Sequence, residues 1–327
     1  MQYSGWIIIG LACVVLIINL ALFRLIRIEN KEKKKLISEL DALQRKLAEY
    51  AKLLPRSLMQ LLELMNYKEG ATPEIGSHNR IETVIADVNM SGFSEYSQSM
   101  ASSSVVESVN NLLSGIIPAV TQNGGTIEGF SEAGLTALFG NEYEKAVTAS
   151  ISICDGVRQK TGGDEDIAVG ICDGSVLLGI VGHEDIMSVL ALTGDMDFAS
   201  FLRSIGYKYN ARIIVTSQVL GKIPDAKRRY NCRQLGYICV KSTQTLVQIF
   251  DVFDGDSASS RNSKRKTKMV FEKGVALYYG GEILQARQHF VEVLKTDSRD
   301  RAAKEYLLLC DGVLNRLTPH VSYIESF

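Results

Sequence analysis

The stretch GGTIEGFSEAGLTALFG, residues 124–140, contains the residues whose types and spacing first suggest chemistry. Its apolar positions predict two buried strands, and the turn between them carries the carboxylate of Glu132 next to Ala133. Loops held between buried strands often carry catalytic or binding side chains. The chemistry open to this turn is that of a single carboxylate, which would hold a divalent cation only weakly.

Other groups with metal-binding or redox chemistry are too scattered to form a motif. No two of the six cysteines have C-x-x-C spacing, and the four histidines are dispersed, so no zinc or redox site is predicted. Reduced, mostly buried thiols in a cytosolic domain are the preferred interpretation. Charge is balanced, with 36 basic and 37 acidic residues, so no nucleic-acid-binding surface stands out. The cysteines are Cys13, Cys154, Cys172, Cys232, Cys239 and Cys310, and the histidines are His78, His183, His289 and His320.

Residues 1–28 are predicted to anchor the chain in a membrane. The uncharged apolar run at 6–23 is long enough, as a helix, to span a bilayer core of roughly 30 Å. A cleaved signal peptide is disfavoured because MQYSG has no basic residue, and a buried core helix because a basic cluster follows at 24–35. Since basic residues mark the cytoplasmic side, we expect a single-pass protein of the inner (plasma) membrane, with its N-terminus outside and most of the chain in the cytoplasm.

Residues 29–67 are predicted to form a coiled-coil linker. Six residues are spaced alternately by four and three, which is the seam of a coiled coil. Next to a membrane span this spacing favours a parallel dimer stalk, and an amphipathic helix lying on its own domain is the alternative. Pro55 interrupts the helix, and a second, more apolar helix follows at 55–67. The seam consists of Leu36, Leu40, Leu43, Leu47, Tyr50 and Leu54.

Residues 78–254 alternate between strand-like and helix-like patterns, which predicts an α+β sandwich. Cys172-Asp173-Gly174 is typical of a hairpin turn, so 167–182 are predicted to be two strands. Further strands are expected at 82–88, on both sides of the turn at 131–134, at 212–220 and at 235–253, and helices at 105–120, 141–159 and 197–209.

The remainder divides into a predicted polar linker at 255–268, which lacks apolar periodicity, and predicted helices at 269–327. The helical part matches some of the tetratricopeptide-repeat (TPR) pattern. One helix pair cannot bury its apolar face alone, so we expect these TPR-like helices to pack on the main domain or on a partner. The matching residues are Gly274, Leu277, Ala286 and Phe290, and Ser298 replaces the usual closing proline.

Five segments resemble, in order, the successive blocks of the class III adenylate/guanylate (nucleotidyl) cyclase catalytic domain. They are ADVNMSGFSEYS, GGTIEGFSEAGLTALFG, VGICDGSVLLGIVG, LTGDMDFASFL and RIIVTSQV, within about 80–254. The resemblance implies a ferredoxin-like βαββαβ core and a head-to-tail dimer with its active sites at the interface. The membrane run, the short coiled linker and the trailing helices also resemble bacterial members of the family.

The resemblance also implies what an active site would contain. In such cyclases two aspartates hold two magnesium or manganese ions, which activate the ribose 3′-hydroxyl and bind the triphosphate. A lysine and an aspartate or threonine read the base, while an asparagine and an arginine from the other subunit steady the ribose and the developing charge. Five of these six positions are lost or displaced in this chain. The metal positions fall on Asp87 and Ala133, the base-reading positions on Gly129 and Val189, the asparagine on Met196 or Asp197, and the arginine on Phe201, with Arg203 two places on.

The leading prediction is therefore a degenerate family member: a membrane-anchored, dimeric pseudo-cyclase that acts as a regulatory or scaffolding module in cyclic-nucleotide signalling. It would pair with itself or with another cyclase-like subunit, and its trailing helices offer a surface for a further protein. The alternative is a divergent but active cyclase that forms a cyclic nucleotide and pyrophosphate, with Asp87 and Glu132 as weak metal ligands. A third hypothesis is a structural protein that builds a membrane-associated assembly.

Overall fold

The computed structural model describes residues 27, 30–46, 56–65, 67, 74–90, 93–98, 101–131, 133–161, 167–183 and 186–327. Contacts within the chain divide it into two compact units, Met1–Arg56 and Ser57–Phe327. In the first unit, residues 30–46 are helical, and the seam residues Leu36, Leu40 and Leu43 are exposed. The rest of that seam and the predicted membrane run at 6–23 lie outside the described residues. Among the helices that are described, none is both long enough and apolar enough to cross a membrane.

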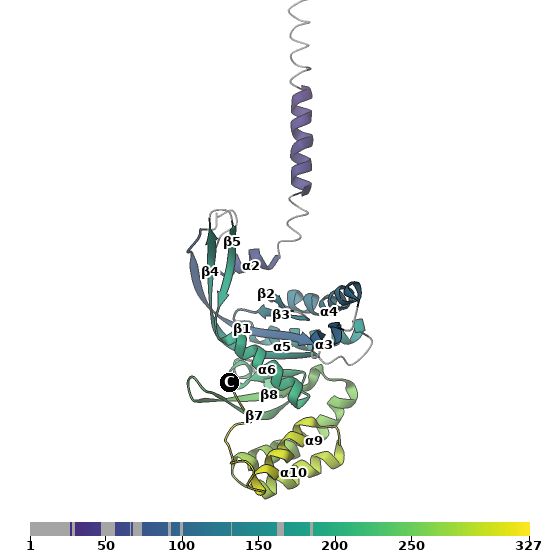
Figure 1. Cartoon of the computed structure of the whole chain (residues 1–327), viewed down its shortest axis with the longest axis vertical. Helices are drawn as coiled ribbons and strands as arrows, with labels where there is room; N and C mark the ends of the chain where they lie inside the picture. The colour runs from purple at the N-terminus through teal and green to yellow at the C-terminus, as the bar shows by residue number, and fades with distance from the viewer. Residues whose placement is uncertain are drawn as a thin grey trace, which may run out of the picture. The chain divides into compact units, whose positions relative to one another are not determined.

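The second unit is built on one mixed sheet, in which the described residues form nine strands (Figure 1). The strand order is β2-β3-β1-β4-β6-β8-β7-β9, and β5 pairs with β4 off this path. β1 is antiparallel to β3 and β4, whereas β4 and β6 are parallel. The strands are β1 (His78–Met90), β2 (Thr126–Ser131), β3 (Gly134–Leu138), β4 (Ile167–His183), β5 (Ile186–Leu192), β6 (Ile213–Thr216), β7 (Cys232–Val240), β8 (Thr245–Val252) and β9 (Glu325–Ser326).

Helices cover both faces of the sheet, and each face has its own apolar core. α4 (Ser102–Gln122) and α5 (Tyr143–Thr161) cover one face, where Val84 and Val88 of β1 are buried. α6 (Asp195–Tyr209) covers the other face, where Ile85 of β1 is buried. Alternate residues of β1 therefore enter different cores, as strand geometry requires. The shorter helices are α2 (Arg56–Leu64), α3 (Phe93–Gln98), α7 (Ser217–Gly221) and α8 (Ala226–Arg229), and η1 (Phe253–Gly255) is a single 3-10 turn.

The predicted βαββαβ core is present. Its strands follow the chain order β1, β2, β3 and β4, with α4 after the first strand and α5 after the third. In space these strands lie in the order β2-β3-β1-β4, which is the ferredoxin-like arrangement. The family resemblance therefore predicted this core correctly.

The predicted hairpin turn at Cys172-Asp173-Gly174 is wrong, because β4 runs without a break from Ile167 to His183. Gly174 permits a close approach instead of a turn, since a Cβ there would lie 2.5 Å from Oδ2 of Asp195. The same oxygen of Asp195 accepts a hydrogen bond from the Ser175 amide at 3.0 Å. The glycine marks the point at which the start of α6 is fixed to β4.

The predicted polar linker at 255–268 is also wrong, because residues 258–268 form the first half of helix α9 (Ala258–Tyr279). Ser257 caps this helix by accepting a hydrogen bond from the Ser260 amide at 3.5 Å. The segment lacks apolar periodicity because polar residues, Lys264 and Thr267, occupy its buried face. A helix whose buried face is polar gives no signal in a hydrophobic pattern.

α9, α10 (Ile283–Thr296) and α11 (Arg301–Leu314) share one apolar core with α6 and β7. In Figure 1 they lie at the opposite end of this unit from the β4–β5 ribbon. Phe290 of α10 packs against Gly274 of α9, where a Cβ would come within 3.0 Å of the ring. The Tyr306 hydroxyl of α11 donates to the carbonyl oxygen of Leu235 at 2.7 Å. The trailing helices thus pack on the main domain, and their TPR likeness stays a prediction.

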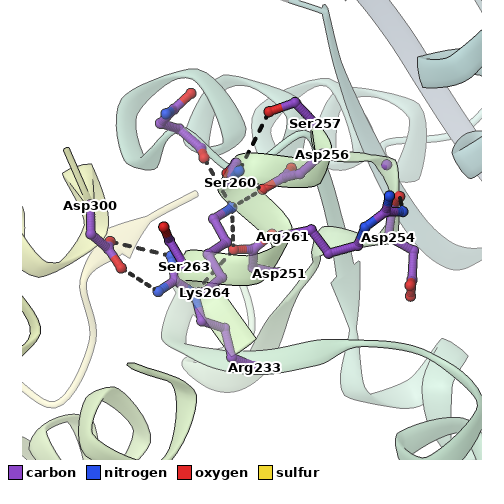
Figure 2. A network of polar contacts seen from close by, with 12 residues as sticks. Arg233, Asp251, Asp254, Asp256, Ser257, Ser260, Arg261, Ser263, Lys264 and Asp300 are labelled. Carbon is purple, nitrogen blue, oxygen red and sulfur yellow. Dashed lines mark hydrogen bonds and ion pairs between the residues drawn. The ribbon is translucent and has the colours of Figure 1, made fainter. Parts of the chain in front are cut away.

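Five buried charged side chains join these helices to β7 and β8 (Figure 2). Arg233 of β7 donates to Asp251 of β8 at 3.1 Å and to both oxygens of Asp300, the N-cap of α11, at 2.6 and 3.3 Å. Lys264 of α9 forms ion pairs with Asp251 at 2.9 Å and with Asp256 at 2.8 Å. Each of the five residues is at most 5% exposed. We call this group the buried charge cluster.

Candidate functional site

Asp87, which the family resemblance predicts at a metal position, forms an ion pair with Arg203 of α6. Oδ1 of Asp87 accepts a hydrogen bond from Nε of Arg203 at 2.9 Å, and the two side chains are 12% and 18% exposed. Nη2 of Arg203 also donates to the hydroxyl of Ser200, three residues earlier on the helix, at 2.7 Å. The carboxylate therefore already has a cationic partner, and that partner comes from its own chain.

The close approach of α6 to the sheet makes this ion pair possible. Asp87 on β1 lies opposite Gly170 on β4. A Cβ on Gly170 would lie 2.0 Å from the carbonyl oxygen of Ala199 and 2.6 Å from the amide nitrogen of Arg203. Only a glycine leaves room here for the helix backbone, and this contact sets the distance from Arg203 to Asp87.

Burial and the guanidinium act in opposite directions on the Asp87 carboxyl. Burial raises the pKa of Asp87 above its ordinary value, and the attraction and hydrogen bond of Arg203 only reduce that rise. The guanidinium carbon of Arg203 lies 5.8 Å from the ring centroid of Tyr207, whose hydroxyl donates to the carbonyl oxygen of Asn89. Burial raises the pKa of Tyr207, so its hydroxyl stays protonated. A guanidinium here supplies the charge that a divalent ion would supply to a metal-binding carboxylate.

Ala133, at the second metal position, lies on the other side of the sheet. It is completely buried in the core beneath α4 and α5, together with Val88 and Leu135. The Met90 amide donates to its carbonyl oxygen at 3.2 Å, which fixes the backbone there. A carboxylate at position 133 would be buried in an apolar cluster away from Asp87. The neighbouring Glu132 lies outside the described residues.

The two base-reading positions provide no polar recognition group. Gly129 lies on β2 with open space beside it, since a Cβ would meet nothing within 4 Å. Val189 lies on β5 opposite Ile180 of β4, where it is half-buried and packs against the apolar core on the α6 side. Neither position can donate a hydrogen bond from its side chain to a purine or pyrimidine.

The positions predicted to contact the ribose and the triphosphate lie on α6 and carry other side chains. Met196 is half-buried against the core, and Asp197 is exposed to solvent. Phe201 lies in an aromatic cluster, with ring centroids 6.5 Å from Phe198 and 5.3 Å from Phe327. In the part of the chain that is described, no three His, Cys, Asp or Glu side chains are grouped so as to hold a metal ion.

Comparison with known proteins agrees with the resemblance seen in the sequence, although no protein-family model matches the chain. The chain is 26% identical over 246 residues to the terminal-differentiation-specific adenylate cyclase of Dictyostelium discoideum. Two structures of a bacterial light-regulated adenylyl cyclase share the fold, with TM-scores of 0.58 and 0.57 at 17% and 16% identity. The chain shares the fold of these adenylyl cyclases over 68% of its length, and we call this part the cyclase homology domain.

The extent of these matches limits what they say about the whole protein. The Dictyostelium match covers 71% of this chain but only 11% of that cyclase. The structural matches cover 68% of this chain and 65% and 66% of the bacterial chains. The chain therefore spans a small part of the curated relative and just under two thirds of the solved ones.

The cyclase homology domain brings together a different group of residues from the one that the sequence predicted. Of the six positions, only Asp87 has a charged partner. That partner is Arg203, and both side chains are largely buried. Sequence reasoning placed Arg203 two residues beyond the arginine position without assigning it a role. The available signal was its spacing from Phe201, which turns the two side chains to different sides of the helix.

Arg203→Ala is expected to lower the free energy of unfolding by about 2 kcal/mol at about pH 8, because a buried carboxylate loses its charge-assisted hydrogen bond. Arg203 lowers the pKa of Asp87, so its loss lets burial raise that pKa further. A folded-state pKa above the unfolded value stabilises the protein at low pH, and this stabilisation is lost as pH rises through the folded pKa. The cost of Arg203→Ala should therefore shrink at about pH 5.

Urea denaturation at the two pH values measures this cost. Lys145→Ala is the control, because Lys145 is 52% exposed and pairs with Glu142 on the surface. The control should change stability by less than about 0.5 kcal/mol at either pH. An equal cost for Arg203→Ala at both pH values would contradict the role assigned to Asp87.

Proposed function

We propose that this protein is a membrane-anchored, dimeric pseudo-cyclase that serves as a regulatory or scaffolding module in cyclic-nucleotide signalling. The observation that carries the proposal is the ion pair at 2.9 Å between Asp87 and Arg203. It neutralises the retained metal position within its own subunit. Two-metal catalysis instead needs carboxylates that bridge both ions and face the substrate.

Restoring a metal site would require two separate changes. A divalent ion at Asp87 would have to displace the guanidinium of Arg203 or bind beside it. The two positive charges would then repel each other strongly, because the site is largely buried. The second carboxylate cannot come from position 133, because Ala133 is fully buried in the other core. Phe201 offers a triphosphate no positive charge in place of the arginine.

The proposed dimer and membrane anchor rest on the first unit of the chain. Leu36, Leu40 and Leu43 are each more than half exposed on the helix at 30–46. Apolar residues at this spacing favour a parallel two-stranded coiled coil. The apolar run at 6–23 and the basic residues after it support an inner-membrane anchor with the homology domain in the cytoplasm. The partner would be a second copy or a catalytic cyclase-like subunit whose activity this protein modulates.

A nucleotide-turnover assay tests the proposal. The purified chain would be incubated with Mn²⁺ and, separately, ATP, GTP, CTP and UTP, with an active class III cyclase domain as the positive control. We expect no cyclic product above the protein-free blank. Glu142→Ala, at an exposed acidic residue, is the control for Asp87→Ala. A cyclic product that disappears in Asp87→Ala and persists in Glu142→Ala would establish the alternative, a divergent active cyclase.

The alternative has one specific support, which is that the relatives reported above are named as adenylyl cyclases. If it holds, Asp87 and Glu132 would be the ligands of Mg²⁺ or Mn²⁺, and Arg203 would have to leave Asp87. In an active cyclase, Arg203→Ala should then raise the rate at which cyclic nucleotide forms. In a pseudo-cyclase, the same variant should form no cyclic nucleotide.

A further inference from the structure

Residues 324–327 lie along the outer edge of β7. The Ile324 amide donates to the carbonyl oxygen of Tyr237 at 2.8 Å, and the Phe327 amide donates to that of Cys239 at 2.9 Å. The Lys241 amide in turn donates to the carbonyl oxygen of Phe327 at 2.9 Å. Two of the four residues form β9, parallel to β7. An extended segment thus occupies a sheet edge that would otherwise present unpaired backbone groups.

Two side chains of this segment enter preformed sites. Ile324 is 8% exposed and lies against Gly236, where a Cβ would come within 3.2 Å of its Cδ1 atom. The ring of Phe327 lies 5.2 Å from that of Phe198 and 5.3 Å from that of Phe201, both on α6. Between these two anchors, Glu325 forms an ion pair with Lys208 of α6. The segment is therefore held by its backbone and by an apolar residue and an aromatic residue three positions apart.

The groove that holds residues 324–327 is not completely filled by them. A cavity of about 330 Å³ opens beside Phe327, with Asp173, Asp195 and Thr216 among its lining residues. Phe327 itself is 36% exposed, so its ring only partly fills the aromatic end. β9 is only two residues long. A short strand with three backbone hydrogen bonds, each worth about 0.5–1.5 kcal/mol net, opens readily compared with the core.

We infer that the edge of β7 and the aromatic face of α6 form a recognition groove for an extended peptide of the form Ile-x-x-Phe. In the structure the groove holds residues 324–327 of its own chain. The occupant that we assign from outside is the same segment of a second copy, because that segment already fits the groove in backbone, charge and side chains. Addition of a strand to a sheet edge is a general mode of peptide recognition, in which backbone bonds give affinity and side-chain pockets give specificity.

Exchange of this segment would link two copies through their homology domains. A dimer stalk, where present, raises the local concentration of the second copy's segment to about the millimolar range. At that concentration even weak pairing of the segment with β7 would be populated. The exchanged segment would still cover Phe201, at the position where active relatives carry the arginine. The inference does not depend on whether the domain turns over a nucleotide.

Peptide binding tests the groove. A fluorescein-labelled peptide of residues 321–327, VSYIESF, would be titrated by fluorescence polarisation with the full chain and with a variant lacking 321–327. We expect saturable binding to the shortened variant and at least tenfold weaker binding to the intact chain, whose own segment competes. Replacing the phenylalanine of the peptide by alanine should weaken binding about tenfold, and replacing the serine that corresponds to Ser326 should change it less than twofold.

Two results would overturn the groove: no saturable binding to a shortened variant that melts cooperatively, or equal binding of a scrambled peptide. If the shortened variant does not fold, full-length Phe327→Ala takes its place, since it loosens one anchor and keeps the chain. It should bind the peptide at least fivefold more tightly than the unaltered chain, and unchanged binding would contradict the inference.

A disulfide trap tests the second copy as occupant. Cys239 of β7 is the register partner of Ser326 of β9, so Ser326→Cys places a thiol opposite a native cysteine. Under mild oxidation we expect a covalent dimer, which is absent from Ser326→Cys combined with Cys239→Ala. If only a cross-link within one chain forms at every concentration, the segment is not exchanged and that part of the inference fails.

Discussion

Replacing Arg233 by alanine is expected to lower the free energy of unfolding by about 3–5 kcal/mol. Arg233 is completely buried and is shared by Asp251 and Asp300. Removing it leaves three buried carboxylates with only Lys264 to balance them. Isolated charges in a protein interior carry the full cost of leaving water, which well-placed partners otherwise offset.

The pKa directions of Arg233 and Asp300 support this expectation, whereas burial raises the pKa of Asp251 in spite of Lys264 and Arg233. Burial lowers the pKa of Arg233, but attraction to Asp300 and Asp251 outweighs burial, so its pKa lies above the ordinary value. Burial would raise the pKa of Asp300, yet Arg233 holds it below the ordinary value. A lowered folded-state pKa contributes stability above the unfolded value, about 3.9, and that stability is lost as pH falls through the folded pKa. Arg233→Ala should remove this part of the acid sensitivity.

Urea denaturation of the full chain, followed by far-UV circular dichroism, measures the effect. Arg229→Ala is the matched control, because Arg229 also pairs with a carboxylate, Glu144, but both are more than two fifths exposed. Exposed pairs contribute about 0–1 kcal/mol, so the control should lie in that range. If the two substitutions cost the same, the buried charge cluster would not be what fixes the trailing helices to β7 and β8.

The sequence predicted the fold well because local hydrophobic patterns indicate most of its helices and strands. Apolar alternation and helical spacing located most strands and helices of the βαββαβ core, and five motifs in order indicated the cyclase fold. The strand predicted at 212–220 is wrong beyond Thr216, where the chain continues as helix α7. The other two errors have one physical cause. Both segments are fixed by contacts with polar residues elsewhere in the chain. Gly174 lies against Asp195, and the first half of α9 is held by Asp251 and Asp256 through Lys264. No hydrophobic pattern records such contacts.

The candidate site was predicted less completely, since it depends on pairings across the fold. Alignment with family motifs located Asp87, but it could not identify Arg203 as the partner of Asp87. Arg203 stands 116 positions further on and reaches Asp87 only because α6 crosses β4 at Gly170. Likewise, the family motifs placed Phe201 at the arginine position, but they could not predict its ring contact with Phe327.

Gly170→Ala is expected to destabilise the protein by about 3 kcal/mol or more, the upper range for overpacking a core. The new Cβ would lie 2.0 Å from the carbonyl oxygen of Ala199, and backbone atoms of a packed helix cannot move aside singly. The whole of α6 would have to shift away from β4. Gly129→Ala is the matched control on β2, because a Cβ there meets nothing within 4 Å. It should change stability by no more than about 0.5 kcal/mol.

A double-mutant cycle then asks what this shift does to the site. If Gly170 sets the distance from Arg203 to Asp87, the ion pair is already lost in Gly170→Ala. Adding Arg203→Ala to that variant should then cost well under the roughly 2 kcal/mol expected for Arg203→Ala alone. Strictly additive costs in urea denaturation would mean that the ion pair survives the shift of the helix. The glycine would then serve packing alone, and some other feature would have to hold Arg203 on the retained metal position.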